Sequence, residues 1–184
     1  MALTASTMLP LGTKAPEFTL IDTVTGKENS LSSLRSDLAT VIVFSCNHCP
    51  YVKHIQTEFL NTVKKYQEKG VTFVAINSNN VIRYPDDAPE KMHDLGVAQH
   101  YTFPYLYDET QAVAKAYHAA CTPDFYVFDK NLSLVYRGRF DASTPGNTLP
   151  VTGEDLGAAL DAVLASQPIS PHQHPSYGCN IKWK

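Results

Sequence analysis

The sequence predicts an α/β fold in which a mixed central sheet with an antiparallel part is flanked by helices. Two observations predict it. Residues 39–77 show a buried strand, an amphipathic helix and a second buried strand in succession, an order that implies parallel strands joined by a right-handed crossover. Residues 122–129 and 132–138 are strand-like runs about two residues apart, which predicts a hairpin. A chain of 184 residues is long enough for one domain of this kind.

The segments that precede the first buried strand are short. Residues 18–22, followed by a turn, predict a hairpin or strand–turn piece, and residues 30–34 predict a single helical turn. We therefore assign residues 10–36 to an N-terminal extension. The core spans about 37–166, and the whole chain, 1–184, is expected to form one domain.

The predicted β–α–β unit is the clearest pattern in the chain. Residues 39–45 are an unbroken apolar, β-branched run, which is typical of a strand buried on both faces. From Pro50 to Gly70 apolar residues recur at helical spacing, with Lys and Glu on the opposite face. Pro50 suits a first helical turn and Gly70 suits a C-terminal stop. Residues 71–77 repeat the pattern of a buried strand.

The second half begins with a segment that shows little periodicity. Residues 79–101 are interpreted as an irregular insertion after the second core strand, with a short helix near residues 89–95. Asp108 with Gln111 three residues later predicts a capping box for a helix that reaches about Ala119.

A final helix and a tail complete the chain. Thr152, with Asp155 three residues later, predicts the start of the last helix. The tail of residues 167–184 holds three prolines and two histidines and ends in the sequence GCNIKWK.

Composition and charge exclude several classes of protein. The net charge is −3, whereas nucleic-acid-binding proteins usually carry a basic excess on one face. The chain has no apolar run of 18 residues, so no transmembrane helix is expected. Residues 1–13 lack the basic start and long apolar stretch of a secretory leader. We expect a cytoplasmic protein with neither a nucleic-acid nor a membrane partner.

The most informative motif is the C-x-x-C pair formed by Cys46 and Cys49. Cys46 follows a buried strand and Pro50 opens a helix, so the pair lies at a strand–helix junction. We expect the helix N-terminus to favour a thiolate at Cys46 and to lower its pKa. His48 adds positive charge there when protonated. Cys46 is then the nucleophile and Cys49 the cysteine that resolves it. The competing interpretation is an exposed His48 without a role.

This motif and several others together resemble a known family. The C-x-x-C pair beside a β–α–β pattern is typical of thioredoxin-like redox proteins. The resemblance covers about residues 10–184 and is to the peroxiredoxin-like (AhpC/TSA-type, redoxin) branch of the thioredoxin superfamily. The stretches that carry it are FSCNHCPYVKH (44–54), FPYLYDETQ (103–111), CTPDFYVFD (121–129), YRGR (136–139) and the terminal GCNIKWK.

The resemblance implies a thioredoxin-like fold and assigns roles by motif position. Cys46 corresponds to the nucleophile, Cys49 to its partner, and Pro123, after Thr122, to a cis-proline beside the active site. The family places a substrate's extended backbone next to this proline. Composition alone favours a trans bond, because only about 5–6% of X–Pro bonds in folded proteins are cis.

The match to true peroxiredoxins is incomplete. Their peroxide-reacting loop has the pattern P-x-x-x-T-x-x-C. If Cys49 is the final cysteine, Cys46 stands at the Thr position and Ile42 at the Pro position. If Cys46 is the final cysteine, these positions hold Val43 and Ala39. This departure weighs against efficient peroxidase chemistry.

The remaining two cysteines have open interpretations. Cys121 stands two residues before Pro123 and could approach Cys46, although a small buried apolar residue is the commoner fate of a free cysteine. Cys179 could resolve an oxidised Cys46. The competing interpretation is a tail packed on the domain through Ile181 and Trp183.

Basic residues outside the motif give weaker indications. Arg137 and Arg139 could stabilise a thiolate or a peroxide oxygen, but a position that simply flanks a strand is favoured. His172 and His174, with Cys179, hint at a metal site, but a solvated segment is favoured. Zinc sites usually need a second cysteine pair of similar spacing. We therefore expect neither a metal nor a cofactor.

The sequence is compatible with three functions. The first is a thiol–disulfide oxidoreductase with a Cys46/Cys49 couple. The second is a thiol-dependent peroxidase in which Cys46 becomes a sulfenic acid that Cys49, Cys121 or Cys179 resolves. The third is a non-catalytic metal chaperone or binding module. The expected partners are protein or small-molecule disulfides, or peroxides, together with an external thiol reductant; the sequence gives no oligomeric state.

Overall fold

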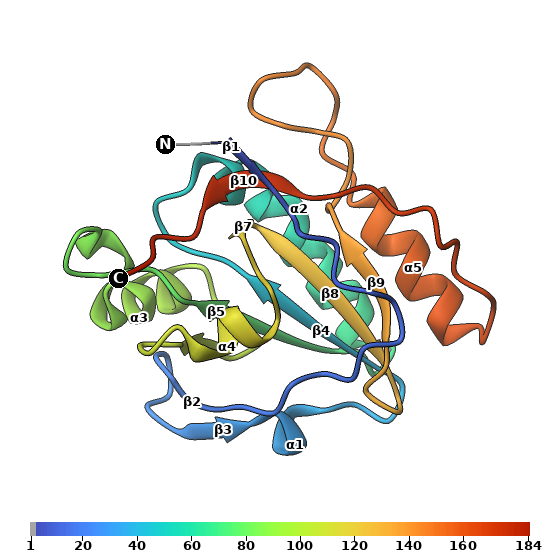
Figure 1. Cartoon of the computed structure of the whole chain (residues 1–184), viewed down its shortest axis with the longest axis horizontal. Coiled ribbons are helices and arrows are strands. Elements are labelled where there is room, and N and C mark those ends of the chain that lie inside the picture. Colours follow the sequence, from blue (N-terminus) through green and yellow to red (C-terminus); the bar gives the residue numbers. More distant parts are fainter. Residues whose placement is uncertain (1–2) are drawn as a thin grey trace.

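The computed structural model describes residues 3–184 and is built around a seven-stranded mixed sheet of order β3-β2-β6-β5-β4-β8-β9 (Figure 1). At its centre, β4 (Ala39–Phe44) pairs in parallel with β5 (Thr72–Asn77). On its other side β4 pairs antiparallel with β8 (Asp124–Asp129), which in turn pairs antiparallel with β9 (Leu134–Gly138). The predicted parallel unit and the predicted hairpin are both confirmed.

The N-terminal segment completes one side of this sheet. β2 (Thr19–Asp22) and β3 (Glu28–Ser30) form the expected hairpin. The single helical turn α1 (Leu31–Leu34) follows, because the Ser30 side chain accepts a hydrogen bond from the N–H of Ser33. Between β2 and β5 lies β6 (Tyr105–Tyr107), a three-residue strand that the sequence analysis did not predict.

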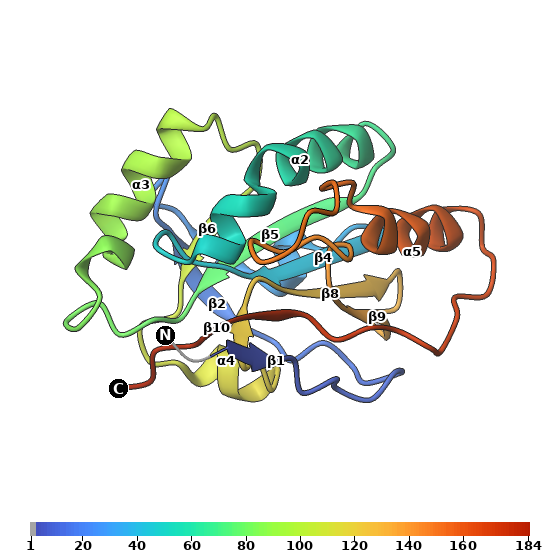
Figure 2. The same cartoon turned by 90° about the horizontal axis from the view of Figure 1, so that it is seen from above.

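Helices cover both faces of the sheet, as Figure 2 shows. On one face lie α2 (Pro50–Gln67), α3 (Pro89–Ala98) and α5 (Glu154–Leu164), whose buried side chains share one apolar core with β4, β5 and β8. On the other face lie α1 and α4 (Ala112–Ala116), which enclose a second core. Each face of β4 therefore contacts apolar side chains, which explains its unbroken apolar sequence.

The predicted capping box at Asp108 and Gln111 is wrong. Gln111 itself is the N-cap of α4, in a left-handed conformation with φ of 64°. The Asp108 carboxylate instead accepts the N–H of Ala114, 2.9 Å away, inside the helix. The helix is also shorter than predicted, since it ends before Ala119.

The predicted last helix is present as α5, but its N-cap is one residue later than predicted, although Thr152 Oγ1 accepts the N–H of Glu154 at 3.4 Å. Its N-cap is Gly153, with φ of 66°, and not Thr152. The N–H groups of Thr152 and Gly153 both donate to Asp141 Oδ2 at 2.7 Å, so a distant carboxylate satisfies the start of α5. Asp155 pairs with Arg139 at 2.5 Å instead of capping the helix.

The tail contains a strand that the sequence did not reveal. β10 (Tyr177–Asn180) lies between β1 (Leu3–Ala5) and β7 (Cys121–Thr122) in a second, three-stranded antiparallel sheet (Figure 1). Beyond it, Ile181 is buried in the second core, while Trp183 remains partly exposed. The tail thus joins both ends of the chain to the segment that precedes Pro123.

The insertion after β5 contains a single 3-10 turn, η1 (Pro85–Asp87), which precedes α3.

Within the described part of the chain, no helix is both long enough and apolar enough to cross a membrane.

Candidate active site

The C-x-x-C pair lies between the end of β4 and the start of α2. Cys46 is two residues beyond the last residue of β4, and Cys49 is the N-cap of α2, with Pro50 as the first helical residue. Proline suits that position because its fixed φ is already helical and its missing N–H has no partner to lose. Cys49, and not Cys46, therefore occupies the helix N-terminus, which differs from the expectation drawn from the sequence.

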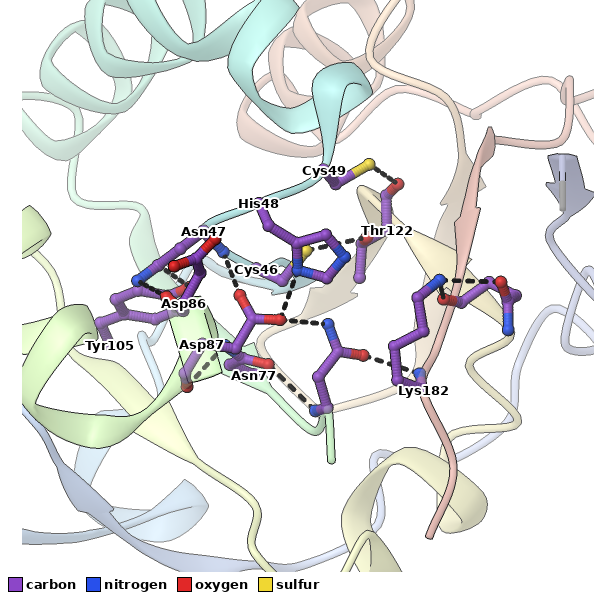
Figure 3. Close-up of polar contacts among 12 residues, drawn as sticks. Cys46, Asn47, His48, Cys49, Asn77, Asp86, Asp87, Tyr105, Thr122 and Lys182 are labelled. Atoms are coloured by element: carbon purple, nitrogen blue, oxygen red, sulfur yellow. Dashed lines mark hydrogen bonds and ion pairs between the residues drawn. The ribbon is translucent and has the colours of Figure 1, made fainter. Parts of the chain in front are cut away.

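The segment before β8 brings a second strand end to the two cysteines. The Thr122–Pro123 peptide bond is cis, as expected. Thr122 contacts both sulfurs, because its Oγ1 lies 3.4 Å from Cys46 Sγ and its carbonyl oxygen lies 3.2 Å from Cys49 Sγ (Figure 3). The structure thus brings together Cys46, Cys49, Thr122 and Pro123, four of the residues that the sequence predicted.

Hydrogen bonds at the two sulfurs make the thiols unequal. A hydrogen bond from the Cys46 thiol lowers the pKa of Cys49, and interactions with Cys179 and with the backbone N–H of Val52 act in the same direction. Burial opposes this shift, and so does the Thr122 carbonyl, since only a protonated Cys49 can donate to it. More groups donate to Cys49 than accept from it, so the reduced site favours a Cys49 thiolate, held against the positive end of α2.

The pKa of Cys46 moves the other way. Its hydrogen bond to Cys49, its burial and the nearby negative charge of Asp87 all hold this pKa well above its usual range. A hydrogen bond with Thr122 offsets only part of the effect. The prediction that the helix favours a Cys46 thiolate therefore does not fit the electrostatics of the site.

Asp87, at the end of η1, is a site residue that the sequence analysis missed. It is fully buried, and its Oδ2 lies 2.6 Å from His48 Nδ1. The N–H of Asn47 donates to Oδ1 at 2.7 Å, and Asn79 Nδ2 donates to Oδ2 at 2.8 Å. Burial opposes ionisation, but the hydrogen bond from His48 and the other two donors lower the pKa of Asp87. No sequence motif marks this residue, which lies in the irregular insertion.

The contact with Asp87 changes the expected role of His48. A carboxylate only accepts hydrogen bonds, so the Nδ1 atom of His48 carries the hydrogen. The ring also stacks on Tyr84, with 5.2 Å between ring centroids, while its Nε2 atom is buried and has no hydrogen-bond partner among residues 3–184. The negative charge of Asp87 lies against the His48 ring, so it offsets the effect that a protonated His48 would have on Cys46.

The loop between the cysteines is held on its other side by Tyr105. The Tyr105 hydroxyl donates to Asn47 Oδ1 at 2.9 Å, and Asn47 Nδ2 donates to the carbonyl of Asp86 at 2.9 Å (Figure 3). These contacts join β6 and η1 to the residue that follows Cys46. The loop is thus fixed by two separate segments of the chain, β6 and η1.

Both remaining cysteines lie near the pair, at different places. Cys179, on β10, packs in one cluster with Cys46 and Cys49. Cys121 is buried too, but its Sγ faces the carbonyls of Pro123 and Ser176, each 3.9 Å away.

The basic residues singled out in the sequence have partners away from the sulfurs. Arg137 Nη1 donates to Gln173 at 2.8 Å, and Arg139 pairs with Asp155. His172 is exposed, and the backbone carbonyl of His174 accepts the N–H of Arg139. The structure does not bring these four residues to the C-x-x-C pair.

One group of side chains has the composition of a metal site. Cys46, His48 and Asp87 offer ligand atoms that all lie within 4.8 Å of one another. A thiolate, an imidazole and a carboxylate together would suit zinc. The close hydrogen bond between His48 and Asp87 already occupies two of these three atoms.

Comparison with known proteins assigns the chain to a family. Residues 11–137 match the AhpC/TSA family. The chain belongs to the AhpC/TSA family. Membership supports a thiol-based redox function, since the described structure places a buried pair of cysteines at the end of a central strand. Among curated proteins, none matches the chain significantly.

Solved structures of similar proteins agree with this assignment. An uncharacterized conserved protein from Geobacillus kaustophilus is 55% identical, with a TM-score of 0.98 over 100% of this chain and 97% of that one. A hypothetical protein from Sinorhizobium meliloti 1021 is 43% identical, with a TM-score of 0.95 over 98% of each chain. The thioredoxin domain of a thiol-disulfide oxidoreductase from Bacteroides vulgatus is 15% identical, with a TM-score of 0.63 over 83% of this chain and 99% of that one. This last likeness confirms the thioredoxin-like fold.

Proposed function

We propose that this AhpC/TSA-family chain is a thiol–disulfide oxidoreductase that uses Cys46 and Cys49 as a dithiol–disulfide couple. The observation that carries the proposal is the buried cluster in which Cys46 and Cys49 pack together at the start of α2, beside Pro123. The interaction between the two cysteines lowers the pKa of Cys49 and raises that of Cys46, so the site favours one thiolate next to one thiol, the arrangement that disulfide exchange needs.

The electrostatics favour Cys49 as the attacking sulfur, in place of the Cys46 nucleophile expected from the motif. The Cys49 thiolate attacks a substrate disulfide, forms a mixed disulfide and releases one substrate thiolate, which takes up a proton. Cys46 then loses its proton and attacks Cys49, so the second substrate thiol leaves and a Cys46–Cys49 disulfide forms. Two electrons have passed to the substrate, and an external thiol reductant returns the couple to its dithiol form.

Substrate access is restricted at this site. Cys46 is 1% exposed and Cys49 is 0% exposed, because β10 and Thr122 cover them. A cleft runs beside Pro123, between the first turns of α2 and the start of β10, and includes Tyr51, His54 and Tyr177 in its wall. A protein or small-molecule disulfide that lies in this cleft reaches the sulfurs only when β10 moves.

The test is reduction of insulin disulfides by dithiothreitol in the presence of the protein. We expect turnover with the wild type and with Cys121→Ser, whose thiol lies outside the sulfur cluster, and none with Cys49→Ser. A mixed disulfide that accumulates on Cys46 in Cys49→Ser would reverse the two roles. Absence of turnover with the wild type would refute the proposed function.

The family match favours thiol-dependent peroxidase activity as a second candidate. In that case the attacking thiolate reduces a peroxide, becomes a sulfenic acid and is resolved by the neighbouring thiol with loss of water. The Thr and Pro of the peroxiredoxin loop are absent from this chain in either register, so we rank this function below disulfide exchange.

A further inference from the structure

Cys179 approaches the C-x-x-C pair from the opposite end of the chain. It lies on β10, where it pairs in antiparallel register with Thr122 on one side and with Leu3 on the other. It is 3% exposed and forms one cluster with Cys46 and Cys49. Residues that are far apart in the sequence thus hold three sulfurs together.

The close approach of β10 depends on the residue next to Cys179. A Cβ atom at Gly178 would lie 2.0 Å from the carbonyl oxygen of Thr122 and 2.7 Å from its carbon. Only glycine allows the strand to pass so near to Thr122. The same carbonyl oxygen lies 3.2 Å from Cys49 Sγ, so β10 is seated directly against the sulfur site.

Further hydrogen bonds fix β10 at both ends. Ser176 Oγ donates to the carbonyl of Gly138 at 2.7 Å, just before the strand. Just after it, the N–H of Lys182 donates to Asn79 Oδ1 at 2.8 Å, and the N–H of Asn80 donates to the carbonyl of Lys182 at 2.8 Å. The position of Cys179 is therefore determined by the fold and is not that of a loose tail.

Cys49 packs with two other cysteines, Cys46 and Cys179, in one buried cluster. Interactions with both neighbours lower its pKa. A sulfur forms only one disulfide at a time, so Cys49 has two alternative partners. Cys121, although equally buried, faces carbonyl oxygens.

The strand that carries Cys179 also occupies a distinctive place. It adds to the edge of β7 at Thr122, beside Pro123, in the manner of an extended peptide that adds a strand to a sheet edge. β10 thus presents Cys179 to Cys49 much as a bound substrate strand would present a cysteine of its own.

From this geometry we propose that Cys179 is a third redox-active cysteine, which forms a disulfide with Cys49 in alternation with Cys46. The proposal rests on the thiol–disulfide exchange proposed above. In the Cys46–Cys49 disulfide, the Cys179 thiol loses its proton and attacks Cys49 Sγ. The Cys49–Cys179 bond forms, the Cys46–Cys49 bond breaks, and Cys46 leaves as a thiolate that takes up the proton. No electrons are gained or lost in this step. It exchanges the Cys46–Cys49 disulfide for a disulfide between Cys49 and Cys179 on β10.

Oxidation of Cys49 also removes a barrier to this attack. In the reduced site, burial, the hydrogen bond with Cys49 and the charge of Cys49 raise the pKa of Cys179 to about 12. In a disulfide, Cys49 carries no charge and is no longer a thiolate that accepts a hydrogen bond from Cys179. Of the three causes that raise the pKa of Cys179, only burial then remains. Cys179 becomes a better nucleophile at the stage where it is needed.

The same geometry gives a second route to the Cys49–Cys179 disulfide. In a mixed disulfide between Cys49 and a substrate, Cys179 can displace the substrate thiolate in place of Cys46. The two electrons that reduce the substrate then come from the Cys49/Cys179 pair. This route predicts that loss of Cys46 alone does not trap the mixed disulfide.

The test follows the fate of Cys49 in three variants. Reduced Cys46→Ser, Cys46→Ser/Cys179→Ser and Cys46→Ser/Cys121→Ser are mixed with hydroxyethyl disulfide, quenched with acid, alkylated and mapped by peptide mass spectrometry. We expect Cys46→Ser and the Cys121 control to form an intramolecular Cys49–Cys179 disulfide. We expect Cys46→Ser/Cys179→Ser to stop at a mixed disulfide on Cys49. A persistent mixed disulfide on Cys49 in Cys46→Ser, or no reaction there, would overturn the proposal.

The wild type provides a second readout that does not depend on the folding of a variant. We expect its oxidised form to contain both the Cys46–Cys49 and the Cys49–Cys179 disulfides. A Cys46–Cys49 disulfide in every molecule, with Cys179 always in the thiol form, would contradict the role of Cys179 and leave the proposed function intact. Absence of any disulfide at Cys49 would count against both.

Discussion

At the scale of single residues, the difference between the two thiols of the C-x-x-C pair depends on which groups face each sulfur. Cys49 receives hydrogen bonds at the start of α2, whereas Cys46 faces the charge of Asp87. The sequence predicted both cysteines because the motif and its position after a strand are local, and the family resemblance predicted Pro123. It did not predict Asp87, because no spacing links that residue to the motif 39 residues earlier.

The lowered pKa of Cys49 gives a direct prediction for the reduced protein. We expect thiolate absorbance at 240 nm equal to one cysteine at pH 6, unchanged up to pH 8, and absent in Cys49→Ser. Because the pKa of Cys49 is lowered by folding, its ionisation stabilises the folded state at high pH, and this contribution is lost as pH falls toward about 4. Thiolate absorbance that appears only above pH 8 would contradict the assignment.

Asp87 is expected to control the other thiol. Its negative charge contributes to the raised pKa of Cys46, so Asp87→Asn should lower the pKa of Cys46. The measurement is the second step of the same absorbance titration, at high pH. Asp86→Asn is the matched control, because the contact of Asp86 with Asn47 uses only its backbone carbonyl. An equal shift in both variants would show that Asp87 acts through the net charge of the loop.

At the scale of secondary-structure elements, β10 covers the sulfur site. Its position beside β7 leaves no room for a side chain at residue 178, since a Cβ would lie 2.0 Å from the Thr122 carbonyl oxygen. The sequence did not predict this strand. Three- and four-residue strands such as β1, β6 and β10 carry too few residues for a period to show, and they form because distant segments supply their hydrogen bonds. The two central strands were predicted from their unbroken apolar runs and the longest helix from its helical spacing of apolar residues, both of which are visible in the local sequence.

Gly178→Ala should therefore loosen the cover. A clash of this kind typically costs about 1–3 kcal/mol. If that cost weakens the docking of β10, alkylation of Cys46 and Cys49 by iodoacetamide in the folded protein should become about 5- to 150-fold faster. Gly146→Ala, where a Cβ would meet only Thr144 Oγ1 at 3.9 Å, is the control and should leave the rate unchanged. An unchanged rate in Gly178→Ala would show that the thiols become accessible by another movement.

At the scale of the whole molecule, the free energy of unfolding should depend on pH through Asp124, whose buried carboxyl group lies next to Pro123. Burial raises the pKa of Asp124 to about 7, although its hydrogen bond with Tyr126 acts against the shift. In the unfolded chain this pKa is about 3.9. The folded state therefore binds more protons between these values, and the free energy of unfolding falls as pH rises from about 4 to about 7.

Asp124→Asn should remove this loss. Relative to the wild type, the variant should become progressively more stable from pH 4 to pH 7, by at most about 4 kcal/mol across the range. Urea unfolding at a series of pH values measures the difference. Asp94→Asn, at an exposed site, should follow the wild type at every pH. A constant difference between Asp124→Asn and the wild type at all pH values would contradict the raised pKa.

Thiol–disulfide exchange by Cys46 and Cys49 can be separated from peroxide reduction in one stopped-flow comparison. Fully reduced protein is mixed with hydroxyethyl disulfide or with hydrogen peroxide, and the products of each reaction are mapped by peptide mass spectrometry. We expect rapid formation of a disulfide at Cys49 from the disulfide reagent and slow oxidation by peroxide. Rapid oxidation by peroxide through a sulfenic acid, with little reaction with the disulfide, would show that the protein is a peroxidase and not a disulfide oxidoreductase.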